Sequence, residues 1–561
     1  MKKKYIIGLI IILLVCFGVG LFFLDFEEEK IINDTVKVID QEVDLDNGEE
    51  KVAWDSFDIK DIRLSSSLEI TKSGIYNLSG SLKNGNITIN TTGDVKLIFN
   101  NISIKNNNGP AIYVSNANNV VIEINGVNRL EDGNTYSDSS LDGCIFSKDD
   151  IVFQGLGTLD VIGNYMDGIV SNNDIKFVSG TYNINSNGDG IRGKDSVYIV
   201  DGNFNIRSGN DGIKSTTTDD VTKGFINIDN GNIVINSKED GIQAETKLII
   251  NNGKFNITTG EGSKAVGSAI DKKYGSGKTY STVSSKGIKA VGNLVINDGE
   301  FIIDSKDDAI HSNNYVGIVD GNITISSGDD GIHADKEIII DGGVVEIKQS
   351  YEGIESEDIT INDGDISVVS NDDGINISGG VDKSSVGGRP GENHMVGNGG
   401  LLHITGGKVY VNSLGDGIDS NGKVIIDDGE IIVDGPTSDG NGALDYDTYF
   451  EVNGGELYAV GSSGMSQNVS GGNQNTIMFN LDKTYSGMVS ILCDNDLVLS
   501  FEPSKKYSSV VVSSDLLEKG KEYSIEIDDK VIASIKVSGT VNTYGNNRND
   551  RGPGGRGPGG R

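Results

Sequence analysis

Apolar and polar positions alternate in short stretches along most of the chain, and glycine separates one stretch from the next. Residues 326–350 read SSGDDGIHADKEIIIDGGVVEIKQS, in which KEIII and VVEIK are strand-like and a Gly-Gly pair lies between them. Alternation of period two predicts β-strands, and Gly-marked breaks predict tight turns. No part of this region has a convincing helical period, so the pattern predicts an all-β fold.

One phrase, Asp-Gly-Ile or a close variant, recurs through the middle of the chain. Most copies lie 21–23 residues apart, and each unit holds three short strands. Such a unit cannot bury its own apolar face, so successive units must stack in register. The repeat predicts a right-handed parallel β-helix with about 22 residues per coil. The phrase begins at Asp167, Asp189, Asp211, Asp240, Lys286, Asp308, Asp330, Glu352, Asp373, Asp416 and Asp439.

The N-terminal residues have a different composition. Residues 1–4 are basic, residues 5–24 form an uncharged apolar run, and residues 25–55 form an acidic linker. Twenty apolar residues are long enough to span a bilayer, with the basic end in the cytoplasm. We therefore expect an N-terminal anchor helix in the cell membrane, single-pass, with the bulk of the chain extracellular. A cleaved signal peptide is the alternative.

The remaining segments follow from where the repeat begins and ends. We expect the β-helix over residues 56–465 and a small antiparallel β unit that caps it over residues 466–540. Residues 541–561 are rich in Gly and Arg and are typical of a disordered tail.

Charge and cysteine content narrow the possible partners. The chain has 47 Lys and Arg against 82 Asp and Glu, a formal net charge of −35. Because this charge repels phosphate, we expect no nucleic-acid partner. Three cysteines in 561 residues exclude a disulfide-stapled fold.

Phrases spread along residues 56–540 resemble one known family. They include ITKSGIYNLSG, NGPAIYV, NRLEDG, DGIRGKD, DDAIHSN, GDDGIHAD, YEGIE, DDGIN, GDGIDSNG and NGALDY, and their order along the chain is specific. This arrangement is similar to the bacterial exported carbohydrate-binding β-helix proteins. The resemblance implies a right-handed β-helix like that of pectate lyases, bound calcium, and binding of wall polysaccharide such as cellulose or pectin.

Stacked coils place the first residue of each phrase in one line, which we call the acid column. Carboxylates about 4.8 Å apart repel each other, so the chain needs a compensation. Backbone N–H bonds within each turn are one possibility, and Ca²⁺ is the other, especially where acids are doubled. The candidate Ca²⁺ ligands are Asp211, Asp240, Asp307, Asp308, Asp329, Asp330, Glu352, Asp372, Asp373 and Asp416.

The residue after each Ile forms a neighbouring line, which we call the outer column. It consists of Val170, Arg192, Lys214, Gln243, Lys289, His311, His333, Glu355, Asn376 and Asp419. Alternation from a buried Ile predicts that these side chains face outward, between long insertions that would form a groove. The candidate carbohydrate-binding residues are Arg192, Lys214, Lys289, His311, His333 and Tyr351. A solvated polar face is the alternative, and a transition metal bound by the His311 and His333 pair is a further one.

These features predict a membrane-anchored protein that binds extracellular polysaccharide, pectin- or cellulose-like, on an acidic face supported by Ca²⁺. Two alternatives stay open. A calcium-dependent lyase acting on polyuronate would use a Lys or Arg beside the acid column as its base. A structural adhesin or spacer would need no ligand at all.

Overall fold

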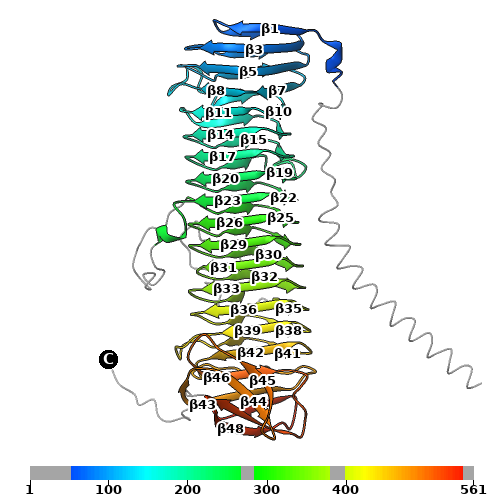
Figure 1. Ribbon diagram of the computed structural model, residues 1–561, viewed down its shortest axis with the longest axis vertical. Helices are drawn as coiled ribbons and strands as arrows, with labels where there is room; N and C mark the ends of the chain where they lie inside the picture. The colour runs from blue at the N-terminus through cyan, green and yellow to red at the C-terminus, as the bar shows by residue number, and fades with distance from the viewer. Residues whose placement is uncertain (1–51, 267–282, 379–398, 547–561) are drawn as a thin grey trace, which may run out of the picture. The chain divides into compact units, whose positions relative to one another are not determined.

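The computed structural model describes residues 52–266, 283–378 and 399–546, all within the compact unit Asn47–Arg561. These residues form 49 β-strands and two short 3-10 helices, Trp54–Ser56 and Ser263–Val266, with no α-helix among them. The all-β prediction is therefore confirmed. A long, mostly parallel sheet accounts for most of the strands, and successive coils lie one above another (Figure 1).

The predicted anchor segment, residues 5–24, lies outside the described residues. Within the described part of the chain, no helix is both long and apolar enough to cross a bilayer. We therefore withdraw the prediction of a single-pass membrane protein.

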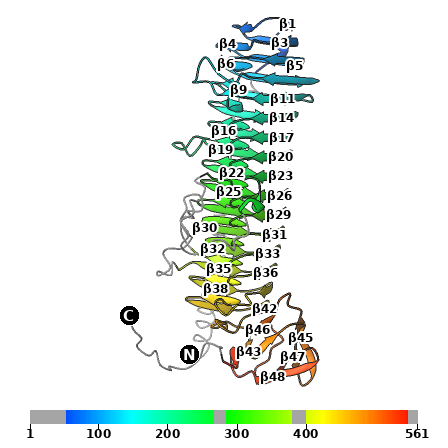
Figure 2. The ribbon, with the colours of Figure 1, turned by 90° about the vertical axis from the view of Figure 1, so that its left-hand side faces the viewer.

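Strands that are three apart in sequence pair in parallel through most of the stack, so three strands complete one coil. This pairing is consistent with a parallel β-helix, and its right-handed sense stays a prediction. Two of the three columns of strands are easily followed in Figure 2. The column of longest regular strands consists of β8 (Val127–Glu131), β11 (Thr158–Gly163), β14 (Thr181–Ser186), β17 (Asn203–Ser208), β20 (Asn232–Ser237), β23 (Lys254–Thr259), β26 (Glu300–Ser305), β29 (Asn322–Ser327), β31 (Val344–Gln349), β33 (Asp365–Ser370), β36 (Lys408–Ser413), β39 (Glu430–Asp434) and β42 (Glu456–Gly461).

A second column carries the Asp-Gly-Ile phrase and its outer-column residue. It consists of β2 (Leu68–Ile70), β4 (Ile87–Asn90), β6 (Ile112–Asn116), β9 (Gly143–Ser147), β12 (Asp167–Ser171), β15 (Ile191–Gly193), β18 (Ile213–Ser215), β21 (Ile242–Ala244), β24 (Ile288–Ala290), β27 (Ile310–Ser312), β30 (Ile332–Ile340), β32 (Ile354–Ile361), β34 (Ile375–Ile377), β37 (Ile418–Ser420) and β40 (Leu444–Tyr446). Strands β30 and β32 continue into the third column.

The third column closes each coil. Besides the ends of β30 and β32, it consists of β1 (Ile59–Leu64), β3 (Gly74–Leu82), β5 (Val95–Lys105), β7 (Val120–Asn125), β10 (Ile151–Gly155), β13 (Asp174–Phe177), β16 (Ser196–Ile199), β19 (Phe225–Ile228), β22 (Lys247–Ile250), β25 (Asn293–Ile296), β28 (Tyr315–Ile318), β35 (Leu401–Ile404), β38 (Lys423–Ile426) and β41 (Tyr449–Val452).

The chain leaves the parallel pattern after β42, which pairs with its next neighbour in antiparallel fashion. Four of the remaining strands form a separate antiparallel sheet, in the order β45-β44-β47-β48. The strands of this C-terminal part are β43 (Thr476–Tyr485), β44 (Val489–Cys493), β45 (Asp496–Phe501), β46 (Tyr507–Ser513), β47 (Glu522–Ile527), β48 (Lys530–Lys536) and β49 (Val541–Tyr544).

Apolar side chains from all three columns fill the interior of the coils. Ile242, Ile288 and Ile310 follow one another in register and are completely buried. Aromatic rings stack in the same way: the centroids of Phe255 and Phe301 lie 4.6 Å apart. Burial of a continuous apolar interior supplies the main stabilisation and fixes the register of the coils.

The glycine of the repeated phrase leaves room for the neighbouring coil. A Cβ atom added to Gly241 would lie 2.4 Å from the carbonyl oxygen of Gly287. Gly440, by contrast, has no heavy atom within 4 Å of such a Cβ atom.

We expect Gly241→Ala to lower the free energy of unfolding by about 1–3 kcal/mol, because the coils must separate locally. Gly440→Ala is the matched control and is expected to leave stability nearly unchanged. Urea denaturation followed by circular dichroism measures both variants, and equal stabilities would contradict the close approach of the coils.

Candidate functional site

The acid column exists as one continuous line of residues, because backbone hydrogen bonds join each coil to the next. The N–H of Gly190 donates to the carbonyl of Asp211 at 2.9 Å, and the N–H of Gly241 donates to that of Lys286 at 2.9 Å. Asp439 is not part of this line. Leu444 pairs with Ile418, so Gly442 takes the position after Asp416. The buried Leu sets this register, not the Asp-Gly pair.

Most carboxylates of the acid column accept a backbone N–H from the next coil. The N–H of Asp189 donates to Oδ1 of Asp167 at 2.8 Å, and the same bond, also 2.8 Å long, joins Asp240 to Asp211. A compensation within each turn was one of our two expectations, and the structure places the bond between coils instead. A charge-assisted hydrogen bond of this kind offsets part of the repulsion between neighbouring carboxylates.

In the N-terminal half of the column, basic residues of the outer column neutralise the acids. Arg192 lies 2.6 Å from Asp142 and 2.7 Å from Asp167. Lys214 lies 2.6 Å from Asp211, and Lys289 lies 3.2 Å from Asp240. Burial alone would lower the pKa values of Arg192 and Lys214, but the facing carboxylates raise both.

The expectation that the outer column faces solvent is therefore corrected. Arg192, Lys214 and Lys289 are half-buried, and His311 and His333 are buried. The long side chains fold back over the corner toward the carboxylates, since unpaired buried acids would be costly. Parts of the insertions predicted to form a groove, residues 267–282 and 379–398, lie outside the described residues.

Lys286 supplies the positive charge in the middle of the column. Its Nζ lies 2.5 Å from Asp308 and 3.2 Å from Asp307. Burial opposes ionisation of Asp308, yet Lys286 and His311 hold its pKa well below the ordinary value. Burial and the nearby Lys286 charge lower the pKa of His311 to about 4, so this ring is neutral at pH 7.

Asp307, Asp308 and Asp329 have carboxylate oxygens within 4.8 Å of one another. Their grouping agrees with the doubled acids that the sequence singled out. Lys286 already neutralises two of these three carboxylates. The negative charge that remains on this cluster therefore gives it less reason to bind a metal ion than an all-carboxylate cluster without a lysine has.

Asp373, Asp416 and Asp419 form a second all-carboxylate cluster, also with oxygens within 4.8 Å of one another. Among the described residues, no Lys, Arg or His forms an ion pair with any of the three. Burial and neighbouring carboxylates raise the pKa of Asp373 to about 9, of Asp419 to about 7 and of Asp416 to about 6. This cluster holds negative charge that the described side chains do not balance.

The donor atoms around this second cluster suit a hard cation. Ca²⁺ takes six to eight oxygen ligands, mainly carboxylates and carbonyls. Asn376 pairs in register with Asp419, and its Oδ1 is buried without a hydrogen-bond partner in the described part of the chain. The three carboxylates, with a buried amide oxygen on the neighbouring strand, therefore suit Ca²⁺.

The other predicted residues lie between the two clusters. Glu352 accepts a hydrogen bond from Asn376 at 2.7 Å, and burial raises its pKa well above the ordinary value. Tyr351 is half-buried; burial and a hydrogen bond with Asp372 raise its pKa. Its ring is therefore not a freely exposed stacking surface for a sugar.

Three residues of the site were absent from the candidate ligands. Asp419 and Glu355 belong to the outer column, and Asp335 follows His333 by two residues. Asp335 is buried, and its Oδ1 lies 3.2 Å from Nε2 of His333. Treating the two columns as one surface would have found Asp419 and Glu355.

We expect Lys286→Met to lower the free energy of unfolding by about 3–5 kcal/mol, because it leaves buried Asp308 and half-buried Asp307 without their cation. Lys254→Met is the matched control: it removes the same charge from an exposed pair with Glu300, at a cost of about 0–1 kcal/mol. Urea denaturation distinguishes the two, and equal losses would contradict the role of Lys286.

We also expect stability without metal to fall as pH rises. A carboxyl group whose folded pKa lies above its unfolded value of about 3.9 binds its proton more tightly when folded. The stability that Asp416, Asp419 and Asp373 contribute is thus complete below about pH 4 and is lost as pH rises to about 9. In EDTA, the free energy of unfolding of Asp419→Asn should decline less steeply with pH than that of wild type. Equal slopes would contradict the raised pKa values.

Comparison with known proteins adds a family context. Residues 65–331 match the model of a family described as carbohydrate-binding domain-containing protein. A carbohydrate-binding domain-containing protein of Acetivibrio thermocellus is 32% identical over 126 residues, which cover 21% of this chain and 44% of that relative. The chain thus matches less than half the length of this curated relative.

A solved structure of a polysaccharide lyase-like protein from C. thermocellum, in a gadolinium derivative, is also similar. It shares 28% sequence identity with a TM-score of 0.37, and the match covers 42% of this chain and 96% of that one. Over residues 65–331, the family model shows that the chain is similar to the carbohydrate-binding domain-containing family.

Proposed function

We propose that this protein binds an acidic, pectin-like polysaccharide through Ca²⁺ held at Asp373, Asp416 and Asp419. One observation carries the proposal: these three carboxylates converge without a balancing cation from the described side chains. The description of the family that residues 65–331 match supports carbohydrate as the ligand class.

The three carboxylates that would hold the ion come from defined positions in two neighbouring columns. Asp373 and Asp416 belong to successive positions of the acid column, and the N–H of Asp416 fixes the Asp373 carboxylate through a 2.6 Å bond. Asp419 reaches the same point from the outer column. Ca²⁺, when bound, supplies the positive charge that a uronate carboxylate can share.

Polyuronate suits this face better than a neutral glycan does. The chain has a net charge of −35, so a polyanion approaching the acid column alone is repelled. A cation shared by the protein and the polyuronate removes that repulsion, so the polyuronate binds only when the cation is present. A neutral glycan such as cellulose needs no cation. Binding should therefore depend on Ca²⁺.

The described basic residues favour binding over cleavage. A lyase base must be neutral to accept the uronate α-proton. Lys214 is paired with Asp211, which raises its pKa, and Lys286 is paired with Asp307 and Asp308. Lys289 donates to Asp240 and Ser284. Each of these lysines is engaged with a carboxylate of the acid column or its neighbour.

The test is a pull-down of the full chain on insoluble polygalacturonate and on cellulose, with Ca²⁺ or with EGTA, while absorbance near 235 nm reports unsaturated product. We expect retention on polygalacturonate that EGTA abolishes. Asp419→Asn should weaken this retention at least about tenfold through loss of a Ca²⁺ ligand. Asp365→Asn, an exposed acid on β33, is the matched control and should bind like wild type.

Each other outcome contradicts a stated part of the proposal. Retention that EGTA does not affect would remove the Ca²⁺ bridge, and retention on cellulose alone would replace polyuronate with a neutral glycan. Unsaturated product would make the protein a lyase. No retention on either polymer would favour a structural role.

A further inference from the structure

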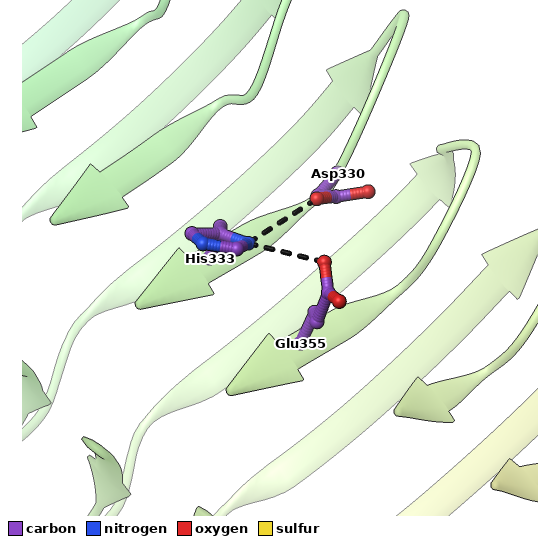
Figure 3. A group of neighbouring side chains, drawn as sticks. All are labelled: Asp330, His333 and Glu355. Carbon is purple, nitrogen blue, oxygen red and sulfur yellow. Dashed lines mark hydrogen bonds and ion pairs between the residues drawn. The ribbon is translucent and has the colours of Figure 1, made fainter. Parts of the chain in front are cut away.

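Asp330, His333 and Glu355 form a buried cluster that differs in chemistry from the two carboxylate clusters. Nδ1 of His333 lies 3.4 Å from Oδ2 of Asp330 and 3.2 Å from Oε2 of Glu355. Figure 3 shows both carboxylates directed at the same ring nitrogen from two neighbouring coils. All three residues are at most 3% exposed.

The separations of these atoms match a tetrahedral metal site. Zn²⁺ binds nitrogen and oxygen ligands at about 2.0–2.1 Å, so two ligand atoms of a tetrahedron lie about 3.3–3.4 Å apart. The two measured separations from Nδ1 agree with that edge length, and the ligand atoms of the cluster all lie within 4.8 Å of one another. One nitrogen and two carboxylates leave a fourth position for water.

The second ring nitrogen of His333 has the partner expected of a metal-bound histidine. Nε2 lies 3.2 Å from Oδ1 of Asp335, which is itself buried. A histidine that ligates a metal through one nitrogen usually donates the other N–H to a carboxylate, which fixes the tautomer and the ring orientation. Asp335 thus acts as a positioning residue for Nδ1.

Asp330 departs from most of the acid column in a way that points to a ligand. Oδ1 of Asp308 accepts the N–H of Asp330 in the next coil, as in most of the column. Oδ1 of Asp330 instead is buried and has no hydrogen-bond partner among the described residues. The Asp330 carboxylate thus lacks the hydrogen bond between coils, and its Oδ2 faces His333. A buried carboxylate oxygen without a hydrogen bond destabilises the fold, and a bound cation would offset that cost.

His311 is the natural comparison within the same column. Its ring stacks on that of His333 with centroids 5.0 Å apart, but its Nδ1 is engaged with Asp308 at 2.8 Å. His311 therefore belongs to the Lys286 cluster, and the two stacked rings do not share one ion.

We propose that Asp330, His333 and Glu355 bind one transition-metal ion, Zn²⁺ by their donor set, independently of the Ca²⁺ site at Asp373, Asp416 and Asp419. A protonated His333 that donates from both nitrogens is the competing explanation of the same contacts. The two explanations differ in whether metal binds, so direct binding separates them. The inference does not depend on carbohydrate binding.

The test measures Zn²⁺ bound to chelator-treated full-length protein, by equilibrium dialysis and elemental analysis, in saturating Ca²⁺. Dialysis is prolonged because the site is buried. We expect one equivalent of Zn²⁺ in wild type and at least about 100-fold weaker binding in His333→Asn and Glu355→Gln. Asp335→Asn should weaken binding by about 10–100-fold. His311→Asn is the matched control and should keep the full equivalent.

A second measurement keeps the proposal testable if a variant fails to fold, which circular dichroism would reveal. Co²⁺ added to wild type should give the intense visible absorption of tetrahedral nitrogen and oxygen coordination, and Zn²⁺ should displace it. Zn²⁺ uptake by folded His333→Asn equal to that of wild type, no uptake by wild type, or only a weak octahedral Co²⁺ spectrum would each overturn the proposal.

Discussion

The hydrogen bond from a backbone N–H in one coil to a carboxylate in the coil before it is the interaction on which the functional face depends. It requires that the coils stack in register, which the continuous apolar interior enforces. The same bond holds the acids in a line and offsets part of the repulsion between neighbouring carboxylates. Without it, a column of buried carboxylates at the spacing of β-strands would favour unfolding.

The source of positive charge changes along this column. In its N-terminal half, the outer column provides Arg192, Lys214 and Lys289, and Lys286 occupies the acid column itself. Beyond His333, the outer column turns acidic with Glu355 and Asp419, so the described protein supplies less positive charge. The two proposed metal sites lie in the part of the column where the described Lys and Arg residues no longer pair with the acids. The need to balance negative charge therefore explains their position.

Much of the fold followed from period and burial. The 22-residue spacing predicted the stack of coils and placed Arg192 beside Lys214 and His311 beside His333, as strand pairing confirms. Burial of those side chains was not predictable. The alternation of apolar and polar residues indicates which way a side chain points, but it does not indicate which other residues cover that side chain. Asp439 shows a related failure, since a Leu at 444 outweighed a matching Asp-Gly pair.

The central claim is that the aligned acids bind cations at defined points of the stack. The most direct test is anomalous diffraction from a crystal equilibrated with Ca²⁺ and Zn²⁺, recorded above and below the zinc edge. The account predicts a peak among Asp373, Asp416 and Asp419 that is insensitive to that edge, and a zinc-specific peak at His333. Ordered crystals with no peak at either cluster, or with peaks away from the acid and outer columns, would contradict it.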